Sequence, residues 1–151
     1  MPEPFSATVG AVAITNILVD TILKLRMLIS SLQGLPLKLS ILITELQILA
    51  ETLGIIEGIH RQEPSLETGP ISSNIVGICN GLINELSETT FKVQNYLKDR
   101  SSLRNGWIKA AWKDRKIKDL EQRLFQTLQL VNLVLETTLL EVFDQHMLPI
   151  S

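Results

Sequence analysis

Side chains able to carry out chemistry are few in this 151-residue chain and stand far apart in its sequence. The two histidines, His60 and His146, each fall near a predicted helix C-terminus, where the helix dipole favours a cation, and neither has clustered metal-ligating neighbours. The single cysteine, Cys79, is far in sequence from both, so a cysteine–histidine pair is not expected. No HExxH, CxxC or phosphate-binding glycine loop is present. We therefore predict a chain that is not an enzyme and needs no metal or cofactor.

The composition favours an all-helical protein. Apolar residues make up 45% of the chain and aromatic residues only 5%, and the β-branched residues show no sustained alternation with period two. This apolar content excludes an intrinsically disordered chain, and residues 1–151 suffice for one domain with a real core. One cysteine excludes a disulfide framework. The net charge of −2 argues against general binding of nucleic acid.

Glycine, proline and polar breaks divide the chain into helices. Ser6 is a candidate N-cap for the first helix, and Gly34 and Pro36 are expected to end it. Ser72 or Ser73 is the expected cap of the third helix. The expected helices cover residues 6–33, 37–60, 72–98 and 107–112, followed by a long final helix. The fold class predicted is all-α, an antiparallel four- to five-helix bundle with short connections.

Apolar residues recur at intervals of three and four in the predicted helices, as expected for faces turned toward a core. In the second helix they are Leu39, Leu42, Leu46, Leu49, Leu53 and Ile56. In the third they are Ile75, Ile78, Leu82, Leu86, Val93 and Leu97. In the last they are Ile117, Leu120, Leu124, Leu128, Val131, Leu135, Leu139 and Val142. Because Leu130, Leu133 and Val134 widen this last stripe, we expect the final helix to be buried on more than one side.

Four glycines have matched spacing in the second and third helices. Gly54 and Gly58 are four residues apart, as are Gly77 and Gly81. In an antiparallel hairpin Gly58 would face Gly77 and Gly54 would face Gly81. Each glycine costs about 1 kcal/mol in a helix interior, so we predict a shared purpose, a close approach of the two helices. Small-residue contacts between subunits in a membrane are the alternative.

A basic segment lies within an otherwise acidic chain. Between residues 92 and 118 nine lysines and arginines accompany only two aspartates, together with Trp107 and Trp112. A basic stretch with tryptophans can bind anionic lipid headgroups. In the alternative interpretation this segment is a solvated loop. Its tryptophans pack against the end of the bundle, and its basic residues pair with acidic neighbours. Nucleic acid is a third option, but no recognised module surrounds the segment.

The N-terminal stretch is unusually apolar. From Pro4 to Val19 the sequence has no charge, yet the run is shorter than the roughly 20 residues of a spanning helix and contains Asn16. The start of the chain lacks the basic region of a signal peptide. An ordinary buried bundle helix is the favoured interpretation of the run.

Several of these features together resemble one family. They are the opening MPEPFS and the small-residue apolar run after it (Ala7, Val9, Gly10, Ala11 and Ala13), Pro36 between the first two helices, Glu45-Leu46 inside the second, and the basic, Trp-containing segment before a long last helix. The chain resembles fungal HeLo and HeLo-like domains, the N-terminal domains of many fungal STAND (NOD-like) receptors and related cell-death proteins.

The resemblance implies a helical effector domain in programmed cell death or innate immune signalling. Such domains are held inactive, then form homo-oligomers and expose the N-terminal helix to anionic membrane lipid. It implies a cytoplasmic protein that relocates to the plasma membrane. The membrane-inserting residues would be Phe5, Val9, Val12, Ile14, Ile17 and Leu18. The lipid-facing basic patch would be Lys98, Arg100, Arg104, Lys109, Lys113, Arg115, Lys116 and Lys118.

The chain departs from the family pattern because no nucleotide-binding domain or amyloid motif accompanies the helices. We expect it to be an excised domain or a stand-alone relative. The alternative function is a helical oligomerisation or adaptor module that recruits other helical domains without membrane activity. The position of the first helix bears on this choice, because a peripheral helix can be released more easily than a central one.

Overall fold

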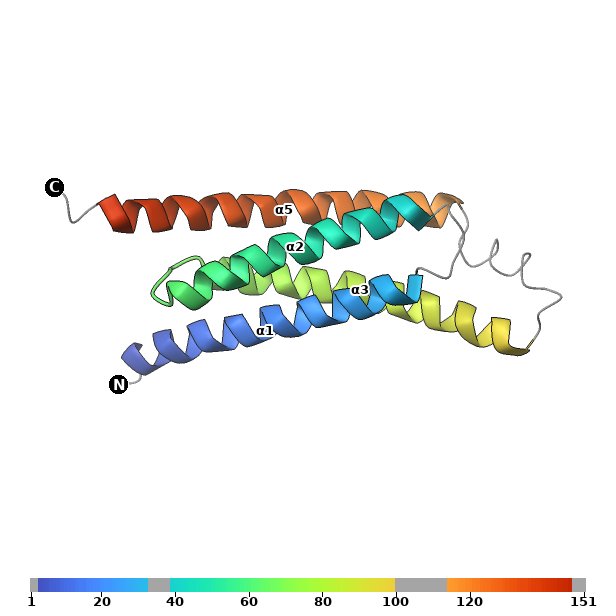
Figure 1. Cartoon of the computed structure of the whole chain (residues 1–151), viewed down its shortest axis with the longest axis horizontal. Coiled ribbons are helices and arrows are strands. Elements are labelled where there is room, and N and C mark those ends of the chain that lie inside the picture. Colours follow the sequence, from blue (N-terminus) through green and yellow to red (C-terminus); the bar gives the residue numbers. More distant parts are fainter. Residues whose placement is uncertain (1–2, 33–38, 100–113, 148–151) are drawn as a thin grey trace.

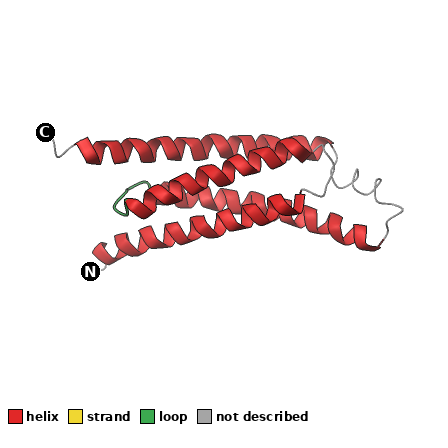
Figure 2. Ribbon diagram, in the orientation of Figure 1, coloured by secondary structure: helices red, strands yellow, loops and turns green. Residues whose placement is uncertain are grey.

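Four long helices account for almost all of the chain that the computed structural model describes, residues 3–32, 39–99 and 114–147 (Figures 1 and 2). Side chains are described for residues 15–32, 39–69, 71–91, 115 and 117–147. The helices are α1 (Glu3–Leu32), α2 (Ser40–Gln62), α3 (Gly69–Asp99) and α5 (Asp114–Met147). None of the described residues forms a strand. The predicted all-α helical bundle is confirmed.

The helix ends differ from the predicted ones in the first three helices. α2 begins at Ser40 and ends at Gln62 instead of at residues 37 and 60. α1 begins three residues before the candidate cap Ser6, and α3 begins at Gly69 instead of at Ser72 or Ser73. Ser72 is already helical, since its N–H donates to the carbonyl of Thr68 at 3.0 Å. The predicted serine cap is therefore wrong. The short helix at 107–112 and the break at Gly34 lie outside the described residues.

Successive helices run in opposite directions, as predicted, but they do not all pack as neighbours (Figure 1). α2 packs mainly on α1 and α5, and α3 also packs on α1 and α5. α2 and α3 therefore lie diagonally across the bundle, although only residues 63–68 connect them. The α1–α3 and α2–α5 pairs run parallel (Figure 1).

The core is built from leucine and isoleucine contributed by all four helices. All six apolar residues predicted to be buried in and next to α2 are buried. In α3 the prediction is wrong for Ile78, which is 48% exposed, while Val76, Cys79 and Ile83 are buried. Val93 and Leu97 lie outside the described side chains. α3 thus turns a face toward α1 and α5 that is rotated from the predicted one.

The final helix buries only one side. The predicted stripe is buried from Ile117 to Val131, and so is Val134, but the prediction is wrong for Leu139, which is 50% exposed. Leu130 is 41% and Leu133 59% exposed. The prediction that α5 is buried on more than one side is therefore wrong. α5 occupies a corner of the bundle, in contact with α2 and α3, so the opposite half of the helix faces solvent.

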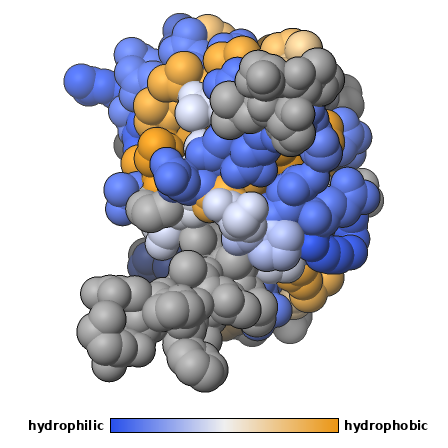
Figure 3. Space-filling view, turned by 90° about the vertical axis from the view of Figure 1, so that its left-hand side faces the viewer, coloured by the Kyte–Doolittle hydropathy of each residue, from blue (hydrophilic) through white to orange (hydrophobic). Residues whose placement is uncertain are grey.

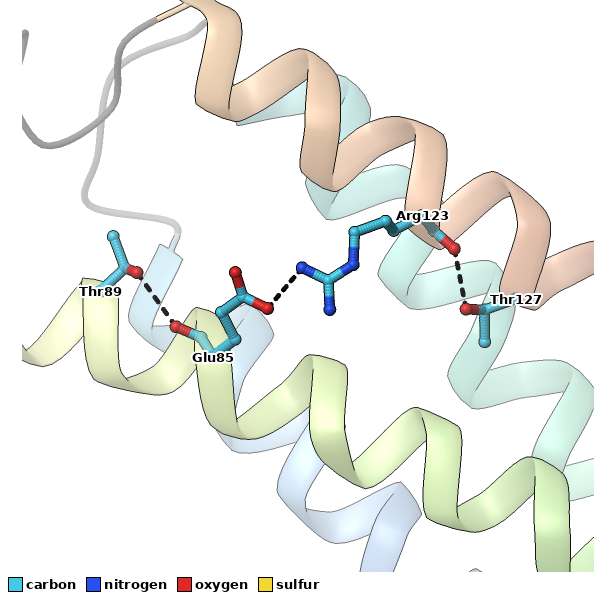
Figure 4. Close-up of polar contacts among 4 residues, drawn as sticks. All are labelled: Glu85, Thr89, Arg123 and Thr127. Carbon is cyan, nitrogen blue, oxygen red and sulfur yellow. Dashed lines mark hydrogen bonds and ion pairs between the residues drawn. The ribbon is translucent and has the colours of Figure 1, made fainter.

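Buried threonine hydroxyls of the bundle are paired locally or between helices. The buried Thr21 hydroxyl lies 2.8 Å from the carbonyl of Ile17 and 3.3 Å from Asn80 Oδ1 of α3. Buried threonines elsewhere donate to the carbonyl four residues earlier, which removes the cost of an unpaired hydroxyl. An ion pair between Glu85 and Arg123 joins α3 to α5 (Figure 4).

Candidate functional site

The first helix carries apolar side chains on two opposite sides. Leu18 and Leu25 are completely buried in the core. On the opposite side, Val19 is 36%, Leu23 51% and Met27 71% exposed. The residues spaced by three and four along this side are Asn16, Val19, Leu23, Met27 and Ser30, all of them exposed, and we call this set the α1 outer face. It is the candidate functional surface.

The α1 outer face was not predicted as a surface from the sequence. The signal was present as regular spacing from Asn16 to Ser30. This spacing could not be interpreted from the sequence, because the core side of the same helix is also apolar. The pattern alone does not show which side faces water.

The predicted membrane-inserting residues fall into two groups. Ile17 is 41% exposed, whereas Leu18 is fully buried and contributes to the core. The side chains of Phe5, Val9, Val12 and Ile14 lie outside the described residues, although their backbone belongs to α1. Insertion into a membrane stays a prediction, and Leu18 could take part only after α1 has left the bundle.

Most of the predicted basic patch lies outside the described side chains. Arg115 and Lys118 are exposed in the first turns of α5. The undescribed members are Lys98, Arg100, Arg104, Lys109, Lys113 and Lys116, and Trp107 and Trp112 are also outside the described residues. The patch stays a prediction.

The predicted close approach at the four glycines is wrong. A Cβ atom placed on Gly54, Gly58, Gly77 or Gly81 would meet nothing within 4 Å. The reason is the diagonal placement of α2 and α3, which keeps their helix axes apart even though they are antiparallel. Gly54 instead lines a groove of about 830 Å³ between α1 and α2.

A second groove lies beside the α1 outer face, between α1 and α3. Its volume is about 330 Å³, and Lys24 and Met27 of α1 line it together with Phe91 of α3. Phe91 is 62% exposed. Since Met27 and Phe91 share this groove, the exposed apolar surface extends from α1 onto α3.

Two other helices also expose apolar side chains. On α2 they are Ile41, Ile48 and Ile55, at intervals of seven residues and 58%, 44% and 53% exposed. On the C-terminal half of α5 they are Leu133, Leu139, Leu140, Phe143 and Met147. Figure 3 looks onto the end of the bundle where α5 finishes, and apolar and hydrophilic surface alternate there.

Polar contacts at this end hold the diagonal connection between α2 and α3 against α5. Both carboxylate oxygens of Glu141 accept the backbone N–H of Glu67, at 3.1 and 2.9 Å. His146 Nε2 lies 3.0 Å from Glu63 Oε1. The hydroxyls of Thr138 and Thr68 lie 3.4 Å apart. These contacts come from three successive turns of α5 and stabilise a connection that has to cross the bundle.

One pair of side chains has the types of a hydrolase nucleophile and base. Ser72 Oγ lies 3.4 Å from His60 Nε2. Burial lowers the pKa of His60, and the nearby Glu141 carboxylate raises it by less. However, both side chains are only 2% exposed, so a substrate cannot reach them in the folded chain. We interpret the pair as a buried polar contact between α2 and α3.

The carboxylate of Glu45 has an unfavourable position on α2. Its Oε2 atom is buried without a hydrogen-bond partner. Burial, and to a lesser extent the Glu121 carboxylate, raise its pKa. The ionised form of Glu45 therefore destabilises the fold, and protonation relieves this cost.

Cys79 is expected to be unreactive in the folded protein. The thiol is fully buried, and this burial raises its pKa to about 12, so almost no thiolate exists at neutral pH. A thiol reagent such as Ellman's reagent at about pH 8 should label the native chain slowly and the unfolded chain at once. The variant Ile41→Cys, with a cysteine at a position of α2 that is 58% exposed, is the control and should be labelled at once while folded. Rapid labelling of the native wild-type chain would contradict the burial of Cys79.

Comparisons with known protein families, with curated proteins and with solved structures gave no match. Within the described ranges, no three side chains of histidine, cysteine, aspartate or glutamate gather closely enough to hold a metal ion. Among the same residues, no helix combines the length and the apolar content that crossing a bilayer requires.

Proposed function

We propose that this chain is a helical effector domain of the HeLo-like kind, which forms homo-oligomers and attaches to anionic membranes through α1. In this proposal it acts in programmed cell death or immune signalling of a fungal STAND-type system, and it moves from the cytoplasm to the plasma membrane when activated. The observation that carries the proposal is the α1 outer face, with Val19, Leu23 and Met27 exposed on the side opposite the buried core residues.

The energetic argument concerns exposed apolar area. Burying a valine, leucine or methionine side chain stabilises by about 1.5 to 3 kcal/mol relative to leaving it in water. A helix with apolar residues on two opposite sides gains this energy on its second side only when another apolar phase covers it. Lipid and a second protein surface are both such phases, which is why α1 supports attachment and self-association alike.

The position of α1 supports its release from the bundle. α1 packs on α2 and α3, and α5 lies diagonally opposite. If α1 leaves, the α2–α5 and α3–α5 contacts remain and can hold the other three helices together. Release still costs the burial of Leu18, Leu25 and Leu32, so a favourable apolar destination is required.

Charge supports an anionic membrane as that destination. The first residues up to Val19 carry no charge after Glu3, and the basic segment, residues 92–118, runs from the last turns of α3 into the first turns of α5. Each lysine or arginine near an anionic surface contributes about 1 kcal/mol. The exposed Arg115 and Lys118 are the described members of this segment.

Leu23→Asp is expected to weaken vesicle binding. A carboxylate at the centre of the α1 outer face must be desolvated at the lipid boundary, so we expect the bound fraction to fall at least about fivefold. The measurement is co-sedimentation with vesicles of phosphatidylcholine and phosphatidylserine at low salt.

The matched control for this experiment is Leu133→Asp, because Leu133 is 59% and Leu23 51% exposed and α5 lies diagonally opposite α1. Leu133→Asp should bind vesicles as the wild type does. Equal losses in both variants, or no wild-type binding to anionic vesicles at any salt concentration, would contradict membrane attachment through α1.

A second candidate function is a helical adaptor without membrane activity. It rests on the outward face of α5, where Leu133, Leu140, Phe143 and Met147 recur at intervals typical of helices that dock on partners. This function predicts an association state that ignores lipid and survives removal of residues 1–20. Light scattering on the full chain and on that truncation, with and without vesicles, separates the two functions.

A further inference from the structure

The α1 outer face is symmetric about Leu23. Val19 precedes Leu23 by four residues and Met27 follows it by four, while Asn16 precedes it by seven and Ser30 follows it by seven. The face therefore has the same order in both directions, with an apolar centre and a polar residue at each end. All five residues are exposed.

Such a face is complementary to itself when a second copy runs antiparallel. With Leu23 on the two-fold axis, Leu23 meets its own copy and Val19 meets Met27 of the other chain. Asn16 then meets Ser30, so that a polar pair closes each end. A two-fold interface of this kind uses the same patch on both subunits and forms a closed dimer.

Charge selects the antiparallel direction over the parallel one. Asp20 and Lys24 lie on the same flank of the α1 outer face, where they form an exposed ion pair of 3.0 Å within the chain. In an antiparallel pair equal flanks meet, so each Asp20 comes opposite Lys24 of the other chain, about 3 Å apart along the helix axis. The two Lys24 residues come equally close along the axis, so the pair has two attractive contacts against one repulsive contact. In a parallel pair this flank would meet the opposite flank, which carries Arg26.

Exposed apolar residues beside the α1 outer face also come together in the antiparallel pair. Lys24, Met27 and Phe91 line one groove, so Phe91 lies on the flank of Asp20 and Lys24. The exposed Ile17, three residues before Asp20, lies on that flank as well. The antiparallel pair therefore brings the exposed Phe91 of one chain toward Ile17 of the other.

We propose that two copies of this chain form an antiparallel dimer through their α1 outer faces, with Leu23 on the two-fold axis. This inference rests on the self-association included in the proposed function and names its surface. Because the same face serves the proposed membrane contact, the dimer is the form of the chain away from lipid.

Cysteine cross-linking tests the register. The variant Leu23→Cys should form a disulfide-linked dimer under mild oxidation with copper phenanthroline, because the two Cα atoms on the axis fall within the roughly 7 Å that a disulfide allows. Native Cys79 is buried and does not interfere. Met27→Cys alone should not cross-link, since the two copies are about 12 Å apart along the axis. A mixture of Met27→Cys and Val19→Cys should give the mixed dimer.

Charge exchange tests the direction and the contact between chains. Asp20→Lys and Lys24→Asp should each raise the dimer dissociation constant about tenfold, because like charges then meet twice. An equimolar mixture of the two variants should restore the wild-type constant to within about twofold, since every lysine again faces an aspartate of the other chain. The ion pair within a chain cannot be restored by mixing. Sedimentation equilibrium with one variant labelled measures both effects.

Other outcomes would overturn the antiparallel dimer or the proposed membrane attachment, and each outcome shows which of the two fails. Cross-linking of Val19→Cys and Met27→Cys each with itself would show a parallel pair. A stable dimer without any of these cross-links would place self-association on another face. A monomer at all concentrations that still binds anionic vesicles would make lipid the occupant of the face. A cross-linked dimer that binds no vesicles would instead overturn membrane attachment and keep the inference.

Discussion

Leu25→Ala is expected to lower the free energy of unfolding by about 2 to 5 kcal/mol. Leu25 is completely buried between α1 and its neighbours, so removing its methyl groups loses the transfer free energy and leaves a cavity. Native bundles of this size have a total stability of about 5 to 15 kcal/mol, so this single change removes a large part of it. Urea unfolding followed by circular dichroism measures the difference.

The matched control for Leu25→Ala is the same substitution two residues earlier. Leu23 is 51% exposed, so Leu23→Ala should change the free energy of unfolding by no more than about 0.5 kcal/mol. Leu23→Ala should nevertheless weaken vesicle binding and dimer formation. If both alanine variants lost the same stability, the assignment of an inner and an outer side to α1 would be wrong.

Acidification below about pH 6.5 is expected to destabilise the fold through His60. Burial lowers the pKa of His60 below its ordinary value of 6.5, so in this range the unfolded chain binds a proton that the folded chain does not. The stability that the neutral histidine contributes is complete above pH 6.5 and is lost as the pH falls toward the folded pKa. The slope reaches about 1.4 kcal/mol per pH unit for one proton.

Glu45 changes the stability of the fold with pH in the direction opposite to His60. Its pKa is raised above 4.5, so the folded chain binds a proton more readily than the unfolded chain and gains stability as the pH falls through that range. The His60 experiment is therefore best made in a Glu45→Gln background. In that background, urea midpoints measured between about pH 5 and 8 should fall with acidification, and His60→Gln or His60→Leu should flatten the slope. A slope that is unchanged in both His60 variants would contradict the assignment.

Glu141, which lies near His60, offers a further control on the direction of this pH dependence. Glu141 raises the pKa of His60 and so opposes the effect of burial. Glu141→Gln should lower that pKa further and extend the destabilisation to lower pH. The same variant keeps a carbonyl oxygen that can accept the N–H of Glu67, so the connection between α2 and α3 can stay held.

Local patterns were sufficient to predict most helix positions and the buried side of α2. Apolar residues at intervals of three and four place Leu42, Leu46 and Leu53 on one side, and all three are buried, since a helix with one apolar side has only one way to face a core. α1 and α5 are different because apolar residues occur on both of their sides. Periodicity then could not tell that Leu23 and Leu133 face water while Leu25 and Val134 face the core.

Residue order along the chain determined that successive helices run in opposite directions and that the chain folds into a helical bundle. Only the tertiary structure decided which helices touch. The matched glycines, Gly58 with Gly77 among them, fit an antiparallel pair equally well whether α2 and α3 are neighbours or lie diagonally, because direction is a property of the connections and adjacency a property of the packed core. The α1 outer face depends on the same choice, since the contacts with α2 and α3 determine which side of α1 remains uncovered.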